Sequence, residues 1–341
     1  MGGPLRIGIL GTANIARSFV KGVQPSERVA VTAIASRNAD RAASFAAELK
    51  IAGVFGSYEA LLADRDIDAV YNPLPNGLHA EWSIAAARAG KHVLCEKPLA
   101  ANAAEARAMF DAARQHGVHI VEGYPYLAQP QTLKMRELLR DGAIGEPKLL
   151  QASFGFTLND AGNIRFDPAL AGGALMDVGV YPVSLARVVA GRRPDRVHAT
   201  AHWTRGNGRD GQGVDSALAA TLEFPGGLLA QISCSFGSAL HRQALIVGSA
   251  GVIETSFANH TSVERPGILS LRTGAGADAV NGKIENPPIN GFLAEAESFQ
   301  ALVRGGPMHW SGATPQESID IMMMLDALLR SARSGASELV G

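Results

Sequence analysis

The fold is decided by an amino-terminal stretch that reads Leu5-Arg6-Ile7-Gly8-Ile9-Leu10-Gly11-Thr12-Ala13-Asn14-Ile15-Ala16. The apolar run 5–10 predicts a strand, Gly11 predicts a tight turn, and a helical pattern follows. Strand, glycine turn and helix in this order is the context of a dinucleotide-binding fingerprint. The backbone amides that could face a pyrophosphate at the start of the helix are those of Thr12, Ala13, Asn14 and Ile15. An unrelated glycine turn is the alternative, because Gly11 is the only fingerprint glycine present.

The next predicted strand, residues 29–35, ends in cationic rather than acidic side chains. A unit that prefers NAD usually has Asp or Glu here for the ribose hydroxyls. This chain instead has Ser36, Arg37 and, at the start of a predicted helix over 39–49, Arg41. A hydroxyl and two guanidiniums suit a 2′-phosphate. Two cations at a helix start oppose the helix dipole, so an anionic partner explains them better than solvation does. The sequence therefore favours NADP over NAD.

Size and composition exclude several other classes of protein. A chain of 341 residues is long enough for two domains, and its net charge of −1 gives no general attraction to nucleic acid or anionic membrane. No uninterrupted apolar run approaches the roughly 18 residues of a membrane span, and the first residues do not resemble a signal peptide. Cys95 and Cys234 are isolated, without metal-type spacing. We expect no metal and a reducing cytoplasm.

A third strand, residues 68–72, is followed by a proline-rich turn and a helix that runs to residue 89. Asn76 is the expected N-cap of this helix. The residues expected to hold the cofactor here are Leu74, Pro75, Asn76 and His79. His79 could instead only complete the first helical turn.

The fourth strand, residues 91–95, delivers Glu96-Lys97-Pro98 to the same edge of the sheet. Ligands of open α/β sheets bind at the carboxyl ends of the strands. A lysine after a buried strand is unusual, because its ammonium is costly to desolvate. Glu96 could offset part of that cost or hold the cofactor. A solvated Glu–Lys pair in a loop is the alternative on spacing alone.

Four motifs occur together in order, and together they resemble one family. They are Gly11-Thr12-Ala13-Asn14-Ile15-Ala16, Pro75-Asn76-Gly77-Leu78-His79, Gly90-Lys91-His92-Val93-Leu94-Cys95-Glu96-Lys97-Pro98 and Gly172-Gly173-Ala174-Leu175-Met176-Asp177-Val178-Gly179-Val180-Tyr181. This combination is similar to the glucose-fructose oxidoreductase / inositol dehydrogenase / rhizopine-catabolism (Gfo/Idh/MocA) family of NAD(P)-dependent oxidoreductases. The resemblance implies an α/β protein with a Rossmann domain, here residues 1–123. It also implies an α+β domain with a large, mainly antiparallel open sheet, here residues 124–341.

The second domain is expected to supply the rest of the active site. Asp177 and Tyr181 lie four residues apart in a predicted helix over 172–189 and therefore share one face. Each alone could be structural, Asp177 at the helix start and Tyr181 in the core. The family pairs them with Lys97, which makes all three the expected catalytic and substrate-binding residues. Tyr124 and Arg165 are further substrate-binding candidates, although Arg165 could be a solvated loop residue.

The remaining elements of the second domain follow from periodicity. The strands expected there are 148–156, 216–224, 228–236 and 243–247, and the helices that close the chain are 292–303 and 315–331.

These expectations combine into one reaction, a hydride transfer between NADP and a hydroxyl or carbonyl carbon of a sugar, polyol or cyclic diol. Lys97 and Tyr181 handle the proton, and their roles can be exchanged. A tyrosine at position 181 resembles the dihydrodiol and D-xylose dehydrogenase, glucose-fructose oxidoreductase and nucleotide-sugar ketoreductase branches. The alternatives within the family are an NAD-dependent glycosidase and a non-catalytic dinucleotide-binding regulator. The resemblance also implies a homodimer or homotetramer.

Overall fold

The structure, a computed structural model of the chain, describes residues 3–205, 213–257, 265–274, 276 and 279–341. The chain forms two compact units. The first unit comprises Met1–Gln129 and Ile289–Pro315, and the second comprises Pro130–Pro288 and Gln316–Gly341. The expected domains were divided at residue 123, with 289–315 in the second. The structure places that segment with the first unit, because its buried apolar stripe completes the core there.

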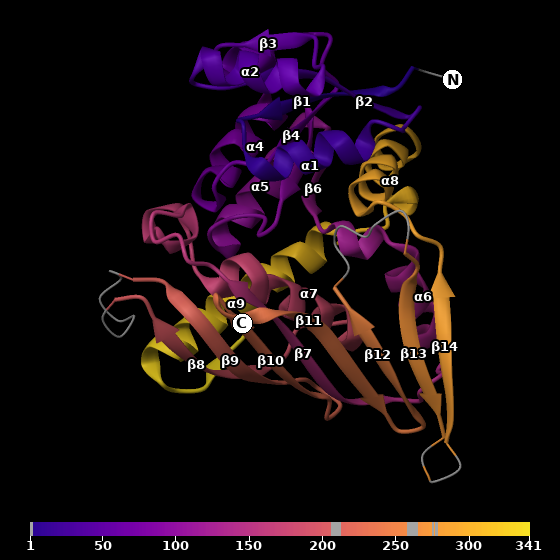
Figure 1. The fold of residues 1–341 in the computed structure, drawn as a ribbon. Coiled ribbons are helices and arrows are strands. Elements are labelled where there is room, and N and C mark those ends of the chain that lie inside the picture. Colours follow the sequence, from indigo (N-terminus) through magenta and orange to yellow (C-terminus); the bar gives the residue numbers. More distant parts are fainter. Residues whose placement is uncertain (1–2, 206–212, 258–264, 275, 277–278) are drawn as a thin grey trace. The chain divides into compact units, whose positions relative to one another are not determined.

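A six-stranded parallel sheet forms the centre of the first unit, in the order β3-β2-β1-β4-β5-β6 (Figure 1). Its strands are β1 (Leu5–Leu10), β2 (Val29–Ala35), β3 (Gly53–Phe55), β4 (Ala69–Asn72), β5 (His92–Glu96) and β6 (Ile120–Gly123). The strand order reverses between β1 and β4, which is the switch point where doubly wound sheets bind dinucleotides. The expected Rossmann architecture is therefore confirmed.

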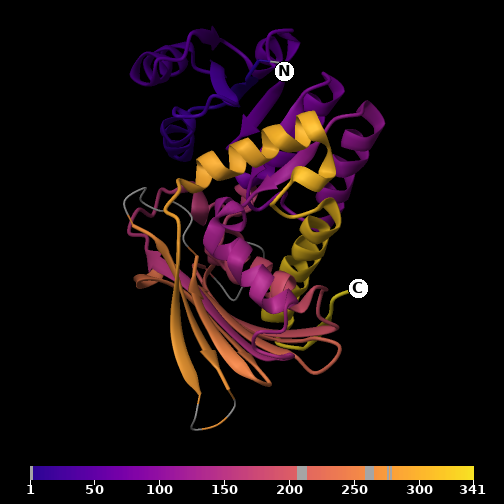
Figure 2. The ribbon, with the colours of Figure 1, turned by 90° about the vertical axis from the view of Figure 1, so that its right-hand side faces the viewer.

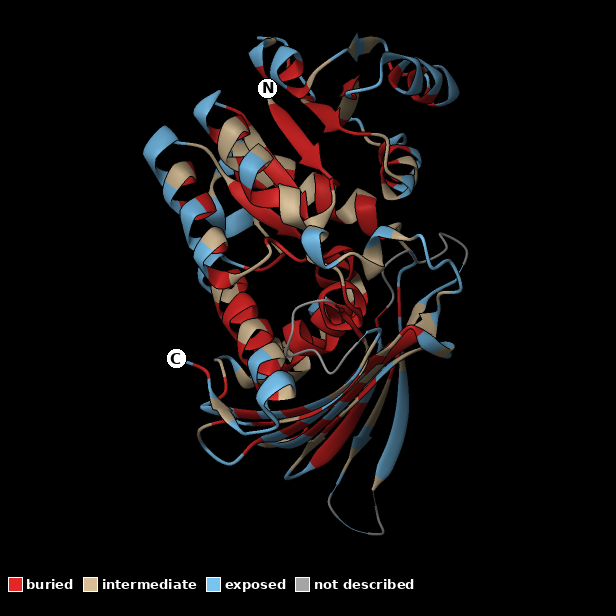
Figure 3. Ribbon diagram, turned by 90° about the vertical axis from the view of Figure 1, so that its left-hand side faces the viewer, coloured by how far each residue is buried: buried red, intermediate tan, exposed pale blue. Residues whose placement is uncertain are grey.

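Helices cover both faces of this sheet, and their outer sides are exposed while the central strands are buried (Figure 3). They are α1 (Asn14–Val23), α2 (Ala39–Leu49), α3 (Tyr58–Ala63), α4 (His79–Arg88), α5 (Ala103–His116) and α8 (Gly291–Gly305), with 3-10 turns at Asn76–Leu78, Pro125–Ala128 and Pro307–His309. The last helix comes from the carboxyl-terminal part of the chain and lies along the unit (Figure 2).

Helix α8 completes the core of the first unit. Phe292 and Phe299 are fully buried on one face of α8, and Phe292 meets the ring of Phe19 from α1 edge-on at 5.9 Å between centroids. Phe19 stacks in turn on Tyr71 of β4 at 3.9 Å. Gly22 permits this close approach, because a Cβ there would lie 2.7 Å from Oδ1 of Asn290. The core therefore needs residues that are about 270 positions apart in the sequence.

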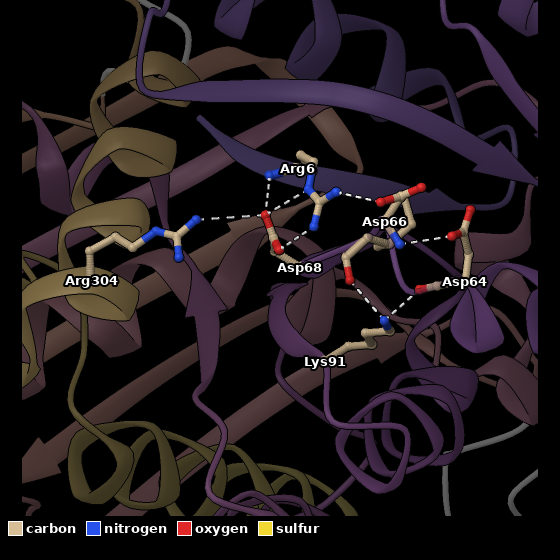
Figure 4. Close-up of polar contacts among 7 residues, drawn as sticks. Arg6, Asp64, Asp66, Asp68, Lys91 and Arg304 are labelled. Carbon is tan, nitrogen blue, oxygen red and sulfur yellow. Dashed lines mark hydrogen bonds and ion pairs between the residues drawn. The ribbon is translucent and has the colours of Figure 1, made fainter. Parts of the chain in front are cut away.

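Polar contacts hold the amino ends of the strands to the end of α8 (Figure 4). The Arg6 guanidinium donates to Asp68 at 2.9 Å, and Arg304 of α8 lies 3.7 Å from the same carboxylate. The Lys91 ammonium donates at 2.6 Å to the backbone carbonyl of Asp64. These groups lie at the amino ends of the strands, whereas the cofactor is expected at the carboxyl ends. Their contacts therefore stabilise the fold of the first unit and do not belong to the cofactor site.

A nine-stranded sheet forms the second unit, in the order β14-β13-β12-β11-β7-β10-β9-β8-β15. Its strands are β7 (Pro147–Thr157), β8 (Arg196–Trp203), β9 (Asp215–Glu223), β10 (Leu229–Ser235), β11 (Gly237–Gly248), β12 (Gly251–Ser256), β13 (Gly267–Thr273), β14 (Val280–Asn286) and β15 (Glu338–Leu339). Only β7 and β10 pair in parallel among the described strands of this sheet. The expected mainly antiparallel sheet is therefore confirmed.

One face of this sheet is covered by helices, and the other is exposed. In β7, Leu150, Ala152 and Phe154 are buried under the helices, whereas Leu149 and Gln151 point to the exposed face. The covering segments are α6 (Pro130–Arg140), 3-10 turns at Ile164–Phe166 and Pro168–Leu170, a π-helical turn at Leu175–Gly179, α7 (Val180–Ala190) and α9 (Pro315–Ser334).

One segment of the described chain, Pro168–Ala190, is long and apolar enough to cross a membrane by length and composition. In the structure 78% of its apolar window is buried. Arg187 of this segment forms an ion pair at 2.8 Å with Asp320 of α9, and both side chains are buried. These contacts are those of a core helix of the second unit.

Candidate active site

The glycine turn after β1 has the geometry of a phosphate-binding turn. Gly11 has φ +86°, and its backbone N–H donates to the carbonyl of Ala35 at 2.8 Å. The positive φ favours glycine, and a Cβ there would also press on the end of the Leu74 side chain at 2.9 Å.

Helix α1 starts without a side-chain cap and without an acid in its first turn. By contrast, side chains cap four other helices of this unit, namely Asn38 for α2, Ser57 for α3, Asn102 for α5 and Asn290 for α8. The free amides and the helix dipole of α1 therefore suit an anion. This fits the pyrophosphate of a dinucleotide.

The carboxyl end of β2 gathers the expected cations. Ser36 is buried, and its hydroxyl accepts the backbone N–H of Asn38 at 3.2 Å. Asn38 caps α2 by accepting the backbone N–H of Arg41 at 2.9 Å. The side chains of Arg37 and Arg41 are exposed at the start of α2. A phosphate between these groups would be held by two guanidiniums, so the donor set fits a 2′-phosphate.

The turn after β4 is held by His79, which is fully buried. Its Nδ1 lies 2.8 Å from the carbonyl of Pro98, and its Nε2 lies 2.7 Å from the carbonyl of Leu74. Burial lowers the pKa of His79 to about 4, although both carbonyls favour the protonated ring. A neutral ring can donate to one carbonyl only. His79 thus fixes the turn of Leu74, Pro75 and Asn76 against the segment that carries Lys97.

Glu96 and Lys97 follow β5 in different surroundings. Glu96 is buried and accepts the hydroxyl proton of Tyr71 at 2.6 Å. Lys97 is half-buried, and the peptide bond from Lys97 to Pro98 is cis. Leu99 donates its backbone N–H to Glu122 at 2.9 Å. Lys97 therefore lies just after β5, on a loop that is held by the Glu96–Tyr71 hydrogen bond before it and the Leu99–Glu122 hydrogen bond after it.

A buried acid from α8 joins this region and was missed by the sequence analysis. Glu295 is almost fully buried, and its carboxyl accepts the backbone N–H of Tyr124. Burial and the nearby charge of Glu96 raise the pKa of Glu295 well above its usual range. The signal was present in the sequence, since an acid interrupts the apolar stripe of Phe292, Ala296 and Phe299. Tyr124 itself is buried at the end of β6, with its ring edge-on to Tyr126.

In the second unit, Asp177 and Arg165 form an ion pair. Nε of Arg165 donates to Oδ2 of Asp177 at 2.6 Å. Asp177 is nearly buried in the π-helical turn, whereas 42% of the Arg165 side chain is exposed. π-Turns inside helices are frequent at functional sites. Arg165 is thus ordered by Asp177 and is not simply a solvated loop residue.

Tyr181 is the second residue of α7, four residues after Asp177. Its ring is buried and lies 5.2 Å from the ring of Phe154 and 6.2 Å from that of Phe257. The aromatic contacts fix the orientation of the phenol. Arg165 of the 3-10 turn thus contacts Asp177, and Tyr181 follows Asp177 by four residues, across the junction between the π-helical turn and α7.

A second missed residue, Asp215, caps the start of this segment. Its carboxylate accepts the backbone N–H of Leu175 at 2.7 Å. A Cβ at Gly173, whose φ is +120°, would collide with Oδ1 of Asp215. Burial raises the pKa of Asp215 to about 6, although the backbone hydrogen bonds favour the charged form. Asp215 comes from β9, so only the tertiary fold brings it to the site helix.

Among the residues that the structure describes, no group of three His, Cys, Asp or Glu side chains could hold a metal ion. The fold and the donors at its strand ends define a dinucleotide-binding protein. Residues 5–124 match the model of an oxidoreductase family with an NAD-binding Rossmann fold, and residues 132–254 match the GFO/IDH/MocA C-terminal domain. The chain belongs to the GFO/IDH/MocA family of oxidoreductases.

Similar proteins extend over most of the chain. The D-xylose 1-dehydrogenase (NADP(+)) 2 of Haloferax volcanii is 40% identical over 98% of this chain and 99% of its own. A trans-1,2-dihydrobenzene-1,2-diol dehydrogenase of Mus musculus is 34% identical over 73% of this chain and 74% of its own. A 3-ketoreductase from Actinomadura kijaniata, solved in complex with NADP and TDP-benzene, has a TM-score of 0.85 at 32% identity and covers 97% of this chain and 98% of its own.

Proposed function

We propose that the chain is an NADP-dependent oxidoreductase that transfers a hydride between nicotinamide and a hydroxyl or carbonyl carbon of a sugar, polyol or cyclic diol. The observation that carries the proposal is the end of β2, where Ser36, Arg37 and Arg41 stand in place of an acid beside the uncapped start of α1. NADP-dependent sugar and diol oxidoreductases among the similar proteins support it.

Cofactor binding is assigned to the strand ends of the first unit. The backbone amides of Thr12, Ala13, Asn14 and Ile15 bind the pyrophosphate, and Arg37 and Arg41 bind the 2′-phosphate. Leu74, Pro75 and Glu96 hold the nicotinamide half, with His79 fixing their turn. When bound, the nicotinamide ring supplies the hydride chemistry.

Lys97 and Tyr181 move the proton at the reacting oxygen of the substrate. The reference pKa of a tyrosine, about 10, is too high for a base at neutral pH, so a neighbouring ammonium must favour the phenolate. Lys97 supplies that positive charge and donates a hydrogen bond to the substrate oxygen. The reverse assignment, with Lys97 carrying the proton and Tyr181 polarising the oxygen, uses the same two groups.

Asp177, Arg165 and Tyr124 orient the substrate. Asp177 accepts hydrogen bonds from adjacent hydroxyls of a sugar or diol, and its ion pair with Arg165 fixes the position of the carboxylate. A polyol with several hydroxyls matches a site of this composition better than an apolar alcohol does.

The proposal is tested by following the absorbance of reduced nicotinamide with NADP or NAD and a panel of aldoses, polyols and cyclic diols. We expect turnover with NADP on at least one aldose or diol, and little with NAD. Cleavage of a glycoside without net change in nicotinamide absorbance would instead support the glycosidase alternative and overturn the proposal.

The exposed face of the nine-stranded sheet is the proposed contact between subunits. It is lined by small and neutral polar side chains that suit a protein surface, among them Ser153, Thr200, Thr221, Gln231 and Gln243. Light scattering after size-exclusion chromatography should give the mass of a homodimer or homotetramer.

The two free, buried cysteines are compatible with the reducing cytoplasm that we propose as the location of the protein.

A further inference from the structure

The turn that carries Asp177 cannot cap its own amino end. The residue at the N-cap of the π-helical turn Leu175–Gly179 is an alanine, whose side chain accepts no hydrogen bond. The two positions before it, Gly172 and Gly173, have no room for a capping side chain. A Cβ at Gly172 would lie 2.5 Å from the carbonyl oxygen of Arg165, and Gly173 has φ +120°. The backbone N–H groups at the start of the turn therefore need an acceptor from elsewhere.

Asp215 supplies that acceptor from β9, 40 residues further along the chain. It is only 1% exposed, and its Oδ2 accepts the backbone N–H of Leu175 at 2.7 Å. A Cβ at Gly173 would collide with the other carboxylate oxygen, Oδ1, so the glycine lets the whole carboxylate lie against the start of the turn. The capping group is thus held by the sheet and not by the segment that it caps.

The other end of the turn lies against the neighbouring strand, β10. A Cβ at Gly179 would lie 2.9 Å from Sγ of Cys234, which is buried. The missing side chain of Gly179 therefore lets the backbone of the turn approach β10 closely. Since β9 holds the start of the turn and β10 contacts its end, the position of Asp177 between them follows that of the sheet.

Hydrogen bonds connect the start of the turn with the pair that is proposed to bind the substrate. The backbone N–H of Asp177 donates to the carbonyl of Gly173 at 3.0 Å, and that of Gly173 donates to the carbonyl of Arg165 at 2.9 Å. Nε of Arg165 donates in turn to Oδ2 of Asp177 at 2.6 Å. These three bonds link Arg165, Gly173 and Asp177 into a closed ring, and Asp215 fastens the adjoining residue Leu175 to the sheet.

We propose that Asp215 is a positioning residue for substrate binding, because its carboxylate fixes the turn that places Asp177 and Arg165. The inference rests on the proposed function in one respect, the assignment of these two residues to the substrate. Asp215 acts through the backbone of Leu175 and is not itself a substrate ligand. Without this cap, Asp177 leaves the position in which it accepts substrate hydroxyls, and a misplacement of about 1 Å in such a group can cost about 100-fold in activity.

The test compares Asp215→Ala with Asp215→Asn in the full chain, using NADP and an aldose, polyol or diol that the wild type turns over. We expect Asp215→Ala to raise the KM for that substrate about 10- to 100-fold, the range for hydrogen bonds to a charged group. Asp215→Asn keeps an acceptor for the Leu175 N–H, so its KM should stay within about threefold of the wild type. The NADPH dissociation constant, measured by nicotinamide fluorescence, should change by less than about twofold in both variants, because the cofactor residues belong to the first unit.

A simple loss of folded protein has a different signature. It lowers the concentration of active enzyme, and hence the apparent kcat, but it leaves the KM as it is. Asp320→Ala is the matched control, since it removes another buried carboxylate of the second unit, one paired with Arg187. It should destabilise the chain without changing the KM.

Asp215→Ser is a second variant in case Asp215→Ala does not fold. Its oxygen lies one bond closer to the backbone than a carboxylate oxygen does, so it falls short of the Leu175 N–H while keeping a polar group in the site. The KM should rise as in Asp215→Ala.

Two measurements show whether Asp215 acts through the substrate-binding pair. The double variant Asp215→Ala/Asp177→Asn should have the KM of Asp177→Asn alone, because the cap reaches the substrate only through this pair. Hydrogen exchange followed by mass spectrometry should be faster in peptides that cover residues 174–179 of Asp215→Ala, and as slow as in the wild type in Asp215→Asn.

The outcomes separate the two ideas. If the wild-type chain turns over no sugar, polyol or diol, the proposed function fails and the role of Asp215 with it. If the wild type is active but Asp215→Ala and Asp215→Ser keep its KM, the role of Asp215 is overturned while the proposed function stands. Additive effects of Asp215→Ala and Asp177→Asn on the KM would also overturn it, as would an equal rise of the KM in Asp215→Asn or in Asp320→Ala.

Discussion

Replacing Asp215 by asparagine should remove a pH-dependent loss of stability from the second unit. Burial raises the pKa of Asp215 from the reference value of 3.8 to about 6 in the folded state. Between these values the unfolded chain releases its proton while the folded chain keeps it. The contribution of Asp215 is therefore fully present below pH 3.8, and it is lost as pH rises to about 6. At 1.36 kcal/mol for each pKa unit, the loss is about 3 kcal/mol.

The asparagine keeps an acceptor for the backbone N–H of Leu175 but does not titrate. The free energy of unfolding of Asp215→Asn, minus that of the wild type, should accordingly rise by about 3 kcal/mol between pH 3.8 and pH 7. Other titrating groups cancel in this difference. If the new amide changes the stability by the same amount at every pH, the pH dependence of this difference in free energy is unaffected.

Urea unfolding followed by tryptophan emission measures this difference. Trp203 pairs directly with Asp215 across β8 and β9, so it reports on the relevant unit. Wild-type and variant chains are compared in one background in which Trp82 and Trp310 are phenylalanine. If the free energy of unfolding of the variant minus that of the wild type stays constant from pH 4 to pH 7, the raised pKa of Asp215 would be falsified. If this difference falls as pH rises, the pKa of Asp215 is lowered by folding, not raised.

Three further changes have defined outcomes. Tyr181→Phe should lower kcat by about 10²- to 10⁴-fold with the NADPH dissociation constant unchanged, and a loss below about tenfold would argue against Tyr181 as a proton carrier. Gly11→Ala should destabilise the chain by about 1–2 kcal/mol in urea and weaken NADPH binding, because φ is +86° there. Gly56→Ala, with open space at its Cβ, is the control and should be near neutral. Asp320→Ala should reduce the free energy of unfolding by about 3 kcal/mol by leaving Arg187 buried without its main partner. Adding Arg187→Met should restore most of that loss, and no recovery would show that the charge was not the cause.

Much of the first unit can be predicted from the sequence. The bounds predicted for β1, β2 and α2 are those of the structure, because each is a clear run of apolar or small residues between polar, glycine or proline neighbours. The short strand β3 and helix α3 are not predicted, since three and six residues are too few for a period to emerge. In the second unit, β14 carries several exposed polar residues, and its two apolar residues are too few to show an alternation.

The candidate site likewise contains residues that the sequence predicts and residues that it does not. Lys97, Asp177 and Tyr181 belong to motifs, so their positions in the fold follow from the sequence, while their catalytic roles stay predictions. Asp215 cannot be found in this way, because it acts through a backbone group 40 residues away in the sequence. Its importance comes from burial, which only the packed structure creates.

Helix α8 has a consequence for how the chain matures on the ribosome. Residues 1–129 emerge first, yet the surface that Phe292 and Phe299 cover is closed only after residue 305 has been made. At about 5–20 residues per second, the nascent amino-terminal part waits roughly 10–35 s with that apolar surface open. A chaperone that binds nascent apolar segments has its natural target there. A fragment ending at residue 129 would keep the same surface open permanently, so it should aggregate unless a peptide spanning residues 289–315 is supplied.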